Sequence, residues 1–100
     1  MARFDVHRSR WSEDSLLVIV QADIFDSLDT RLAIPLLPTR TDRRPVTRLN
    51  PTFEIEGKTY VLYTQHTLAV PVNGLKVPIA NLAGHRDEIV AAVDFLQQGF

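Results

Sequence analysis

One segment of the chain, residues 85–100, has the hydrophobic spacing of an α-helix. Its apolar residues recur at i, i+3, i+4 and i+7 and therefore share one helical face: Ile89, Ala92, Val93 and Leu96. Acidic residues in the first turn suit the helix dipole, and Gly99 suits a left-handed C-cap. The rest of the sequence lacks this spacing, so its core has to come from strands.

The earlier apolar segments are short and have the composition of β-strands. Residues 16–22 (LLVIVQA) are β-branched and apolar almost throughout, which predicts a central strand covered on both faces. Residues 4–6 form a shorter candidate strand. Residues 31–36 form another, which we expect Pro35 and Pro38 to stop, because proline removes a ladder donor and restricts the residue before it.

Turn residues predict two hairpins in the second half. Residues 40–51, bounded by prolines and rich in Thr and Arg, indicate a loop. Apolar and acidic side chains then alternate from residue 52 up to Gly57, which marks a turn before an aromatic and β-branched strand over residues 59–63.

The second hairpin is predicted over residues 67–77. Residues 67–72 and 75–77 have strand composition, and Asn73 and Gly74 between them are a common hairpin dipeptide. The pattern predicts about five to seven short antiparallel strands and one C-terminal helix. Such a chain is α+β, with the helix at one end or face of the sheet.

Length and composition predict one domain over residues 1–100, without repeats or linkers. With 45% hydrophobic and 23% charged residues the chain lies near globular averages, which argues against disorder and a membrane protein. The longest apolar run, residues 16–20, is far below the roughly 20 residues of a membrane span. The first fifteen residues carry charges where a signal peptide would have its apolar region, so no signal peptide is expected. The lack of cysteine excludes disulfides and thiolate sites, and a cytoplasmic location is expected.

The charges are balanced overall but unevenly spread. A formal net charge of −1 argues against general nucleic-acid binding, which relies on a basic excess. Arg40, Arg43, Arg44 and Arg48 fall within nine residues, opposed there only by Asp42. This cluster is either a solvated surface or a site for an acidic partner.

The motifs of catalysis and of metal or cofactor binding are absent from the sequence. It contains neither a phosphate-binding glycine loop nor a metal-binding spacing among His7, His66 and His85. A Ser/His/Asp trio assembled from Ser27, His66 and Asp23 is a match expected by chance, so a small hydrolase is a weak alternative. We therefore expect no catalytic residues, no metal and no cofactor.

Two features suggest contacts with other proteins. Ile24 and Phe25 form an apolar pair between acidic residues just past the predicted central strand, where they either tuck into the core or remain exposed. Phe100 follows Gln97, Gln98 and Gly99, and exposed aromatic anchors often hold a partner.

At these residues the chain resembles the CcdB family of bacterial toxins. The likeness runs from residue 1 to residue 100 in the same order and with similar spacing. It rests on VQADIFD at residues 20–26, IPL at 34–36, LNPTFEIEGKTYVLYTQ at 49–65, AVP at 69–71 and EIVAAVDFLQQGF at 88–100.

The resemblance implies a homodimer with an SH3-like, mainly antiparallel barrel, a small side sheet and a C-terminal helix. It also implies a non-enzymatic toxin that enters between the arms of the DNA gyrase A-subunit dimer and traps the enzyme on cleaved DNA. The gyrase-binding positions it implies are Ile24, Phe25, Asp94, Gln97, Gln98, Gly99 and Phe100.

The same resemblance implies a labile antitoxin as second partner. In the family an acidic, disordered antitoxin segment contacts the first loop and the loop after the third strand, and arginines suit such a chain. Here these loops fall at residues 8–14 and 40–48, which gives the antitoxin-binding candidates Arg8, Arg10, Trp11, Arg40, Arg43, Arg44 and Arg48.

The C-terminal tip departs from the family pattern. Family members end in two aromatic residues, glycine and an aliphatic residue, with a tryptophan that stacks on an arginine of gyrase, whereas this chain has Gln97 and Gln98 before Gly99. Glutamine lacks an aromatic face, whose stacking on a cation is worth up to about 2 kcal/mol. The alternative function is therefore a divergent member that binds antitoxin but has another target or poisons gyrase weakly.

Overall fold

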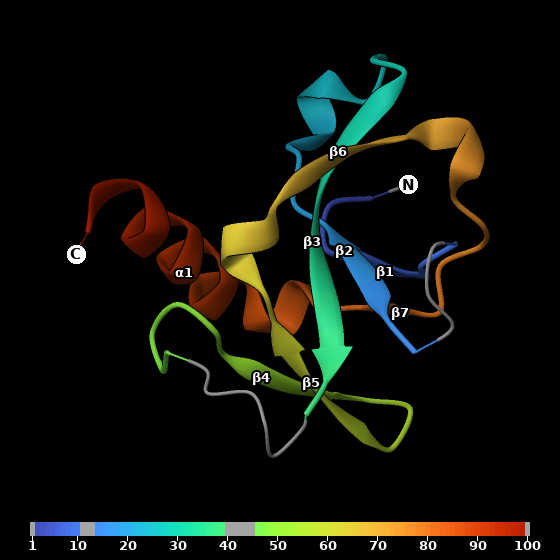
Figure 1. Cartoon of the computed structure of the whole chain (residues 1–100). Helices are drawn as coiled ribbons and strands as arrows, with labels where there is room; N and C mark the ends of the chain where they lie inside the picture. Colours follow the sequence, from blue (N-terminus) through green and yellow to red (C-terminus); the bar gives the residue numbers. More distant parts are fainter. Residues whose placement is uncertain (1, 11–13, 40–45, 100) are drawn as a thin grey trace.

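Antiparallel strands form a nearly closed β-barrel, and one C-terminal helix packs against it (Figure 1). The computed structural model describes residues 2–10, 14–39 and 46–99. The described residues form seven strands in the order β4-β5-β3-β2-β1-β7, with β6 paired to β3 off this path. Their bounds are β1 Asp5–Arg8, β2 Leu16–Ile19, β3 Thr30–Pro38, β4 Thr52–Ile55, β5 Lys58–Leu62, β6 Leu68–Pro71 and β7 Ala80–Asn81. The helix α1 spans Arg86–Gln98, so the predicted α+β class is confirmed.

The central strand is β2, as its composition predicts. It lies between β1 and β3, and all four of its residues are buried. Leu16 and Val18 point into the main core, whereas Leu17 and Ile19 belong to a second apolar cluster on the other face. Because both faces of β2 are covered, an almost continuous apolar run is what this strand requires.

The strand predicted over residues 31–36 is confirmed as β3 and ends at Pro38, but the expectation that Pro35 also stops it is wrong. β3 runs through Pro35, which pairs with Leu17, and ends at Pro38. The Pro35 carbonyl accepts a hydrogen bond from the Tyr63 N–H at 2.9 Å, so this residue's polar groups face the β5–β6 edge. Since β5 ends at Leu62 and β6 begins at Leu68, the missing proline N–H points to a gap between strands, where no ladder bond is lost.

The β4–β5 hairpin is confirmed, with its turn at Glu56 and Gly57. Ile55 pairs with Lys58, which leaves a two-residue loop. Both loop residues have positive φ, 51° and 79°, as a type I′ turn requires.

The second predicted hairpin is wrong, although its first strand, predicted over residues 67–72, is present as β6. Val72–Gly74 forms a 3₁₀ turn, η3, rather than a hairpin loop, and residues 75–77 are not a strand. The Val72 N–H donates to the Asp29 carbonyl at 3.0 Å, which ties the segment to β3. The chain then returns to the opposite end of the sheet, where β7 pairs with β1. Non-local pairing to β3 therefore overrides the local signal of Asn73 and Gly74.

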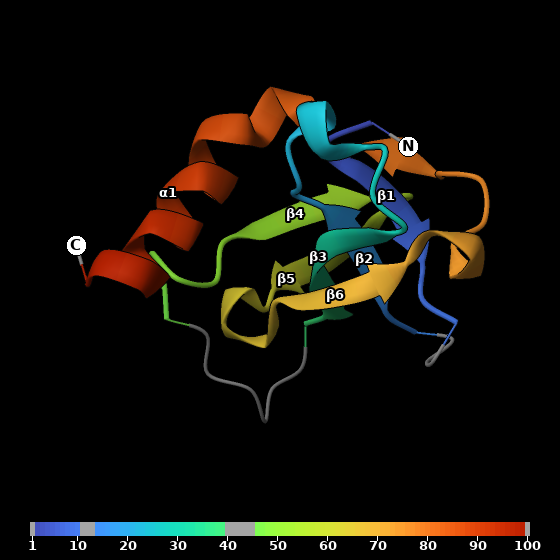
Figure 2. The same ribbon diagram turned by 90° about the horizontal axis from the view of Figure 1, so that it is seen from above.

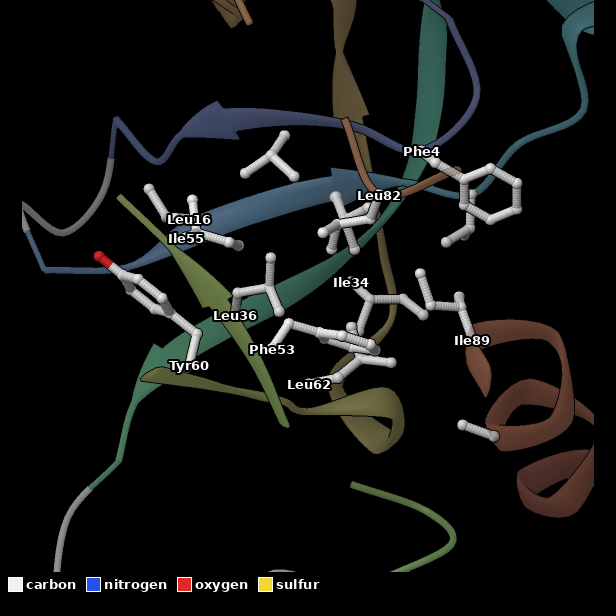
Figure 3. Packing of buried hydrophobic residues seen from close by; sticks show 14 residues of the cluster. Phe4, Leu16, Ile34, Leu36, Phe53, Ile55, Tyr60, Leu62, Leu82 and Ile89 are labelled. Carbon is white, nitrogen blue, oxygen red and sulfur yellow. The ribbon is translucent and has the colours of Figure 1, made fainter. Parts of the chain in front are cut away.

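The helix closes the main core with its first two turns. Ile89 and Ala92 are buried, and Figure 3 shows Ile89 pointing toward Ile34 of the barrel. Val93 is half-buried, and Leu96 is 43% exposed. In Figures 1 and 2 the last turns of α1 extend away from the strands. The predicted helix is thus confirmed, with its apolar face buried only near the barrel.

Candidate functional site

The apolar pair past β2 is exposed, which rules out the alternative that it enters the core. Ile24 and Phe25 are 81% and 54% exposed and belong to a 3₁₀ turn, η1, over Asp23–Phe25. The Asp23 carboxylate accepts a hydrogen bond from the Arg3 N–H at 2.8 Å, and the Gln21 side chain donates to the Phe25 carbonyl at 3.0 Å. These bonds hold the turn in a conformation that exposes two large apolar side chains to water. Their exposed surface adds no hydrophobic stabilisation to the fold.

A buried arginine supports the loop behind η1. The guanidinium of Arg31, a residue only 7% exposed, donates to the carbonyls of Asp26, Leu28 and Thr30. A cation with this many donors can gather several carbonyls at once. The sequence carries no signal for this role, because an arginine at a strand start is usually exposed.

The C-terminal end of α1 displays polar groups and a confirmed left-handed cap. Asp94, Gln97 and Gln98 are exposed. Gly99 has φ 80° and ψ 10°, and its N–H donates to the Phe95 carbonyl at 2.9 Å. The predicted anchor Phe100 lies outside the described residues.

The two halves of the predicted gyrase-binding set lie apart within one chain. Figures 1 and 2 show η1 and the C-terminal end of α1 separated in both views. Between β3 and α1 lies a shallow groove of about 140 Å³, lined in part by Arg3, Leu32, Val93 and Asp94. Asp94 therefore faces this groove, whereas the set as a whole does not form one patch in a single chain.

The predicted antitoxin-binding arginines occupy two regions. Arg8 is at the end of β1 and forms an ion pair with Glu56 at 3.0 Å, with both side chains more than half exposed. Arg10 lies two residues further along, beside Gly74. Arg48 lies in the loop before β4, where its guanidinium stacks over the ring of Phe95 in α1, with Cζ 4.5 Å from the ring centroid. The remaining candidates lie outside the described residues: Trp11, Arg40, Arg43 and Arg44.

Titratable groups are scattered rather than aligned. The described residues contain no group of three or more His, Asp or Glu that could hold a metal ion. His7 is fully buried, and its Nδ1 donates to the Lys76 carbonyl at 2.6 Å. His85 pairs with Glu88 at 3.1 Å on the exposed start of α1, and His66 lies beside the Tyr63 ring. The exposed candidate residues include large apolar side chains and arginines, which are common contacts in protein–protein interfaces.

The described residues contain no helix that is both long and apolar enough to cross a bilayer.

The fold is that of small toxin barrels of known structure. The chain is similar to an endoribonuclease solved in complex with its cognate antitoxin from a mycobacterial species, at 14% identity, with 100% of this chain and 98% of that chain covered and a TM-score of 0.81. It is also similar to the Mycobacterium tuberculosis toxin MazF-mt6, at 16% identity, with 90% and 92% covered and a TM-score of 0.71.

A family model described as CcdB protein matches residues 3–99, and the chain belongs to the CcdB family. It is a toxin of a toxin–antitoxin system.

Proposed function

We propose that this protein poisons DNA gyrase by binding the A subunit and trapping the enzyme on cleaved DNA. The observation that carries the proposal is the exposure of Ile24 and Phe25 on a turn that hydrogen bonds hold in place. Family membership over residues 3–99 supports the target. On this proposal the toxin works in the cytoplasm without catalysing a reaction, and its C-terminal tip, Gln97 to Phe100, makes the second contact.

We further propose that the toxin acts as a homodimer. In a single chain η1 and the helix end lie apart, so one copy offers two separate contacts. A second copy doubles these contacts and lets η1 of one chain and the helix end of the other meet one target. Light scattering on the purified protein tests this point, and a monomer at micromolar concentration would contradict it.

The cognate antitoxin is proposed to neutralise the toxin through an acidic segment that lies along the arginines. Arg10 and Arg48 support this, because both are exposed and neither forms an ion pair within the described residues. Because Arg48 stacks on the helix near its C-terminal end, antitoxin bound there also lies close to the proposed gyrase contact.

The experiment combines gyrase, supercoiled DNA, ATP and the purified toxin, followed by detergent and protease. Linear DNA is expected to accumulate with the full chain, and deleting Gly99 and Phe100 is expected to abolish it. Circular dichroism on the truncated chain serves as the folding control, because these residues lie beyond the helix. Cleavage that persists at full level in a folded truncated chain would show that the tip is not the active surface. No cleavage by the full chain would favour the divergent reading that Gln97 and Gln98 suggest.

A second candidate function is RNA cleavage. The observation that favours it is the similarity of the whole fold to an endoribonuclease. Incubating the toxin with a mixed RNA substrate tests it, with a His66→Gln and His85→Gln double variant as a probe of the exposed histidines. His7 is left in place because it is buried and hydrogen-bonded. Intact RNA after incubation with folded toxin would exclude this function.

A further inference from the structure

A basic pocket lies at the far end of β1 from η1. It has a volume of about 530 Å³ and is lined by Ser9, Arg10, Asn73, Gly74, Leu75 and Lys76. Two of these residues carry positive charge, two others carry a hydroxyl and an amide, and none is acidic. We propose that this pocket binds a side-chain carboxylate of an acidic peptide segment, held between Arg10 and Lys76. The inference rests on the proposed antitoxin binding and assigns a defined binding site to part of the antitoxin.

The first observation is the fit between Arg10 and Gly74. A Cβ atom at position 74 would lie 2.8 Å from Arg10 Nη1 and 3.3 Å from its Cδ. Gly74 is not among the residues with positive φ, so the backbone itself does not need glycine there. An alanine at position 74 would displace the Arg10 guanidinium, which ends a flexible side chain, so the present position of this cation depends on the absence of a side chain at residue 74.

The second observation is that one strand anchors both cations. Arg10 follows the end of β1 by two residues. The Lys76 carbonyl accepts a hydrogen bond from buried His7 of the same strand at 2.6 Å, and the Ile79 N–H donates to the Val6 carbonyl at 2.8 Å. Lys76 is thus held beside the strand that Arg10 follows, and both residues line the same pocket.

The third observation concerns charge. Within the described residues no hydrogen bond or ion pair engages the Arg10 guanidinium or the Lys76 ammonium, in contrast to Arg8, which pairs with Glu56. A guanidinium and an ammonium on opposite sides of one carboxylate can both donate to it. Nucleic acid is a poorer fit, because affinity for it grows with the number of phosphates neutralised and this pocket offers two charges.

The test uses a fluorescein-labelled synthetic peptide of alternating Glu and Ser residues, with its Kd measured by fluorescence anisotropy at low salt. Arg10→Gln and Lys76→Gln are each expected to raise the Kd by about tenfold, the equivalent of about 1.4 kcal/mol. Arg86→Gln is the control, since it removes the same charge from an exposed position on α1. Circular dichroism confirms that each variant is folded.

Gly74→Ala tests whether residue 74 affects peptide binding through the position of the Arg10 guanidinium or through a general change in the fold. It is expected to weaken peptide binding several-fold in the parent chain and to have no further effect in the Arg10→Gln background. The proposal is overturned if Arg10→Gln and Lys76→Gln bind the peptide like the Arg86→Gln control. It also fails if Gly74→Ala weakens binding equally in both backgrounds, or if an RNA of equal length displaces the peptide at lower concentration. Gyrase is absent from this binding assay, so its result does not depend on whether the protein poisons gyrase.

Discussion

Asn50 is expected to be the polar residue whose loss most weakens the loop that carries Arg48. It is 4% exposed, and its side-chain amide donates to the Leu62 carbonyl at 2.9 Å and to the Gln65 side chain at 2.8 Å. Its carbonyl oxygen accepts from the Val46 N–H at 3.0 Å. The residue therefore ties the loop after residue 45 to β5 and to the turn that follows it.

The loss in the free energy of unfolding expected for Asn50→Ala can be worked out from these hydrogen-bond partners. Leu62 is fully buried, so its carbonyl finds no water, and an unsatisfied buried group costs about 1–3 kcal/mol. Val46 and Gln65 are exposed and regain water, so each contributes only part of the roughly 0.5–1.5 kcal/mol of an ordinary hydrogen bond. We expect the free energy of unfolding to fall by about 2–4 kcal/mol, which at about 4–8 °C per kcal/mol lowers the Tm by roughly 10–30 °C.

Urea unfolding followed by far-ultraviolet circular dichroism, at one fixed protein concentration, measures this change. Gln65→Ala is the matched control, because it removes one of the same bonds from an exposed partner, and it is expected to cost below about 1 kcal/mol. A loss below about 1 kcal/mol for Asn50→Ala, or equal losses for the two variants, would refute the reasoning.

Three further outcomes are expected. Glu56→Asn should raise the Tm slightly, because asparagine tolerates the positive φ of this turn position better than glutamate does, and loss of the exposed ion pair with Arg8 offsets only part of that gain. A double-mutant cycle with Arg48→Ala and Phe95→Leu should give a coupling of about 0.5–1 kcal/mol in urea unfolding, and additive effects would exclude the cation–π contact. Ile24→Ser and Phe25→Ser should each leave the Tm within a few degrees and abolish gyrase poisoning, whereas a large drop in Tm would show that these exposed side chains support the fold.

Sequence patterns predict those elements that are determined by residues close together in the chain. The helix over residues 86–98, its glycine cap and the β4–β5 turn each follow from spacing or from a residue with a special backbone preference. The central position of β2 follows from its unbroken apolar run. In these cases the short-range signal and the tertiary structure agree.

The features that the sequence does not predict depend on distant partners. Pro35 is tolerated inside β3 because neither β5 nor β6 pairs with it on the edge that faces away from β2, which depends on where β5 ends and β6 begins. Asn73 and Gly74 form no hairpin because the segment is tied to β3 and then crosses to β1. Within the candidate site, the exposure of Ile24 and Phe25 and the buried role of Arg31 likewise depend on contacts that no spacing rule encodes.

Pro35 also has a consequence for the connection between β5 and β6. β5 and β6 are kept apart along β3, because a strand continued across position 35 would meet no N–H donor there. The turn in this connection, Thr64–His66, packs against α1. One proline thus helps to keep the chain between β5 and β6 in a turn rather than a strand, and this turn supports the helix whose end is proposed to contact gyrase.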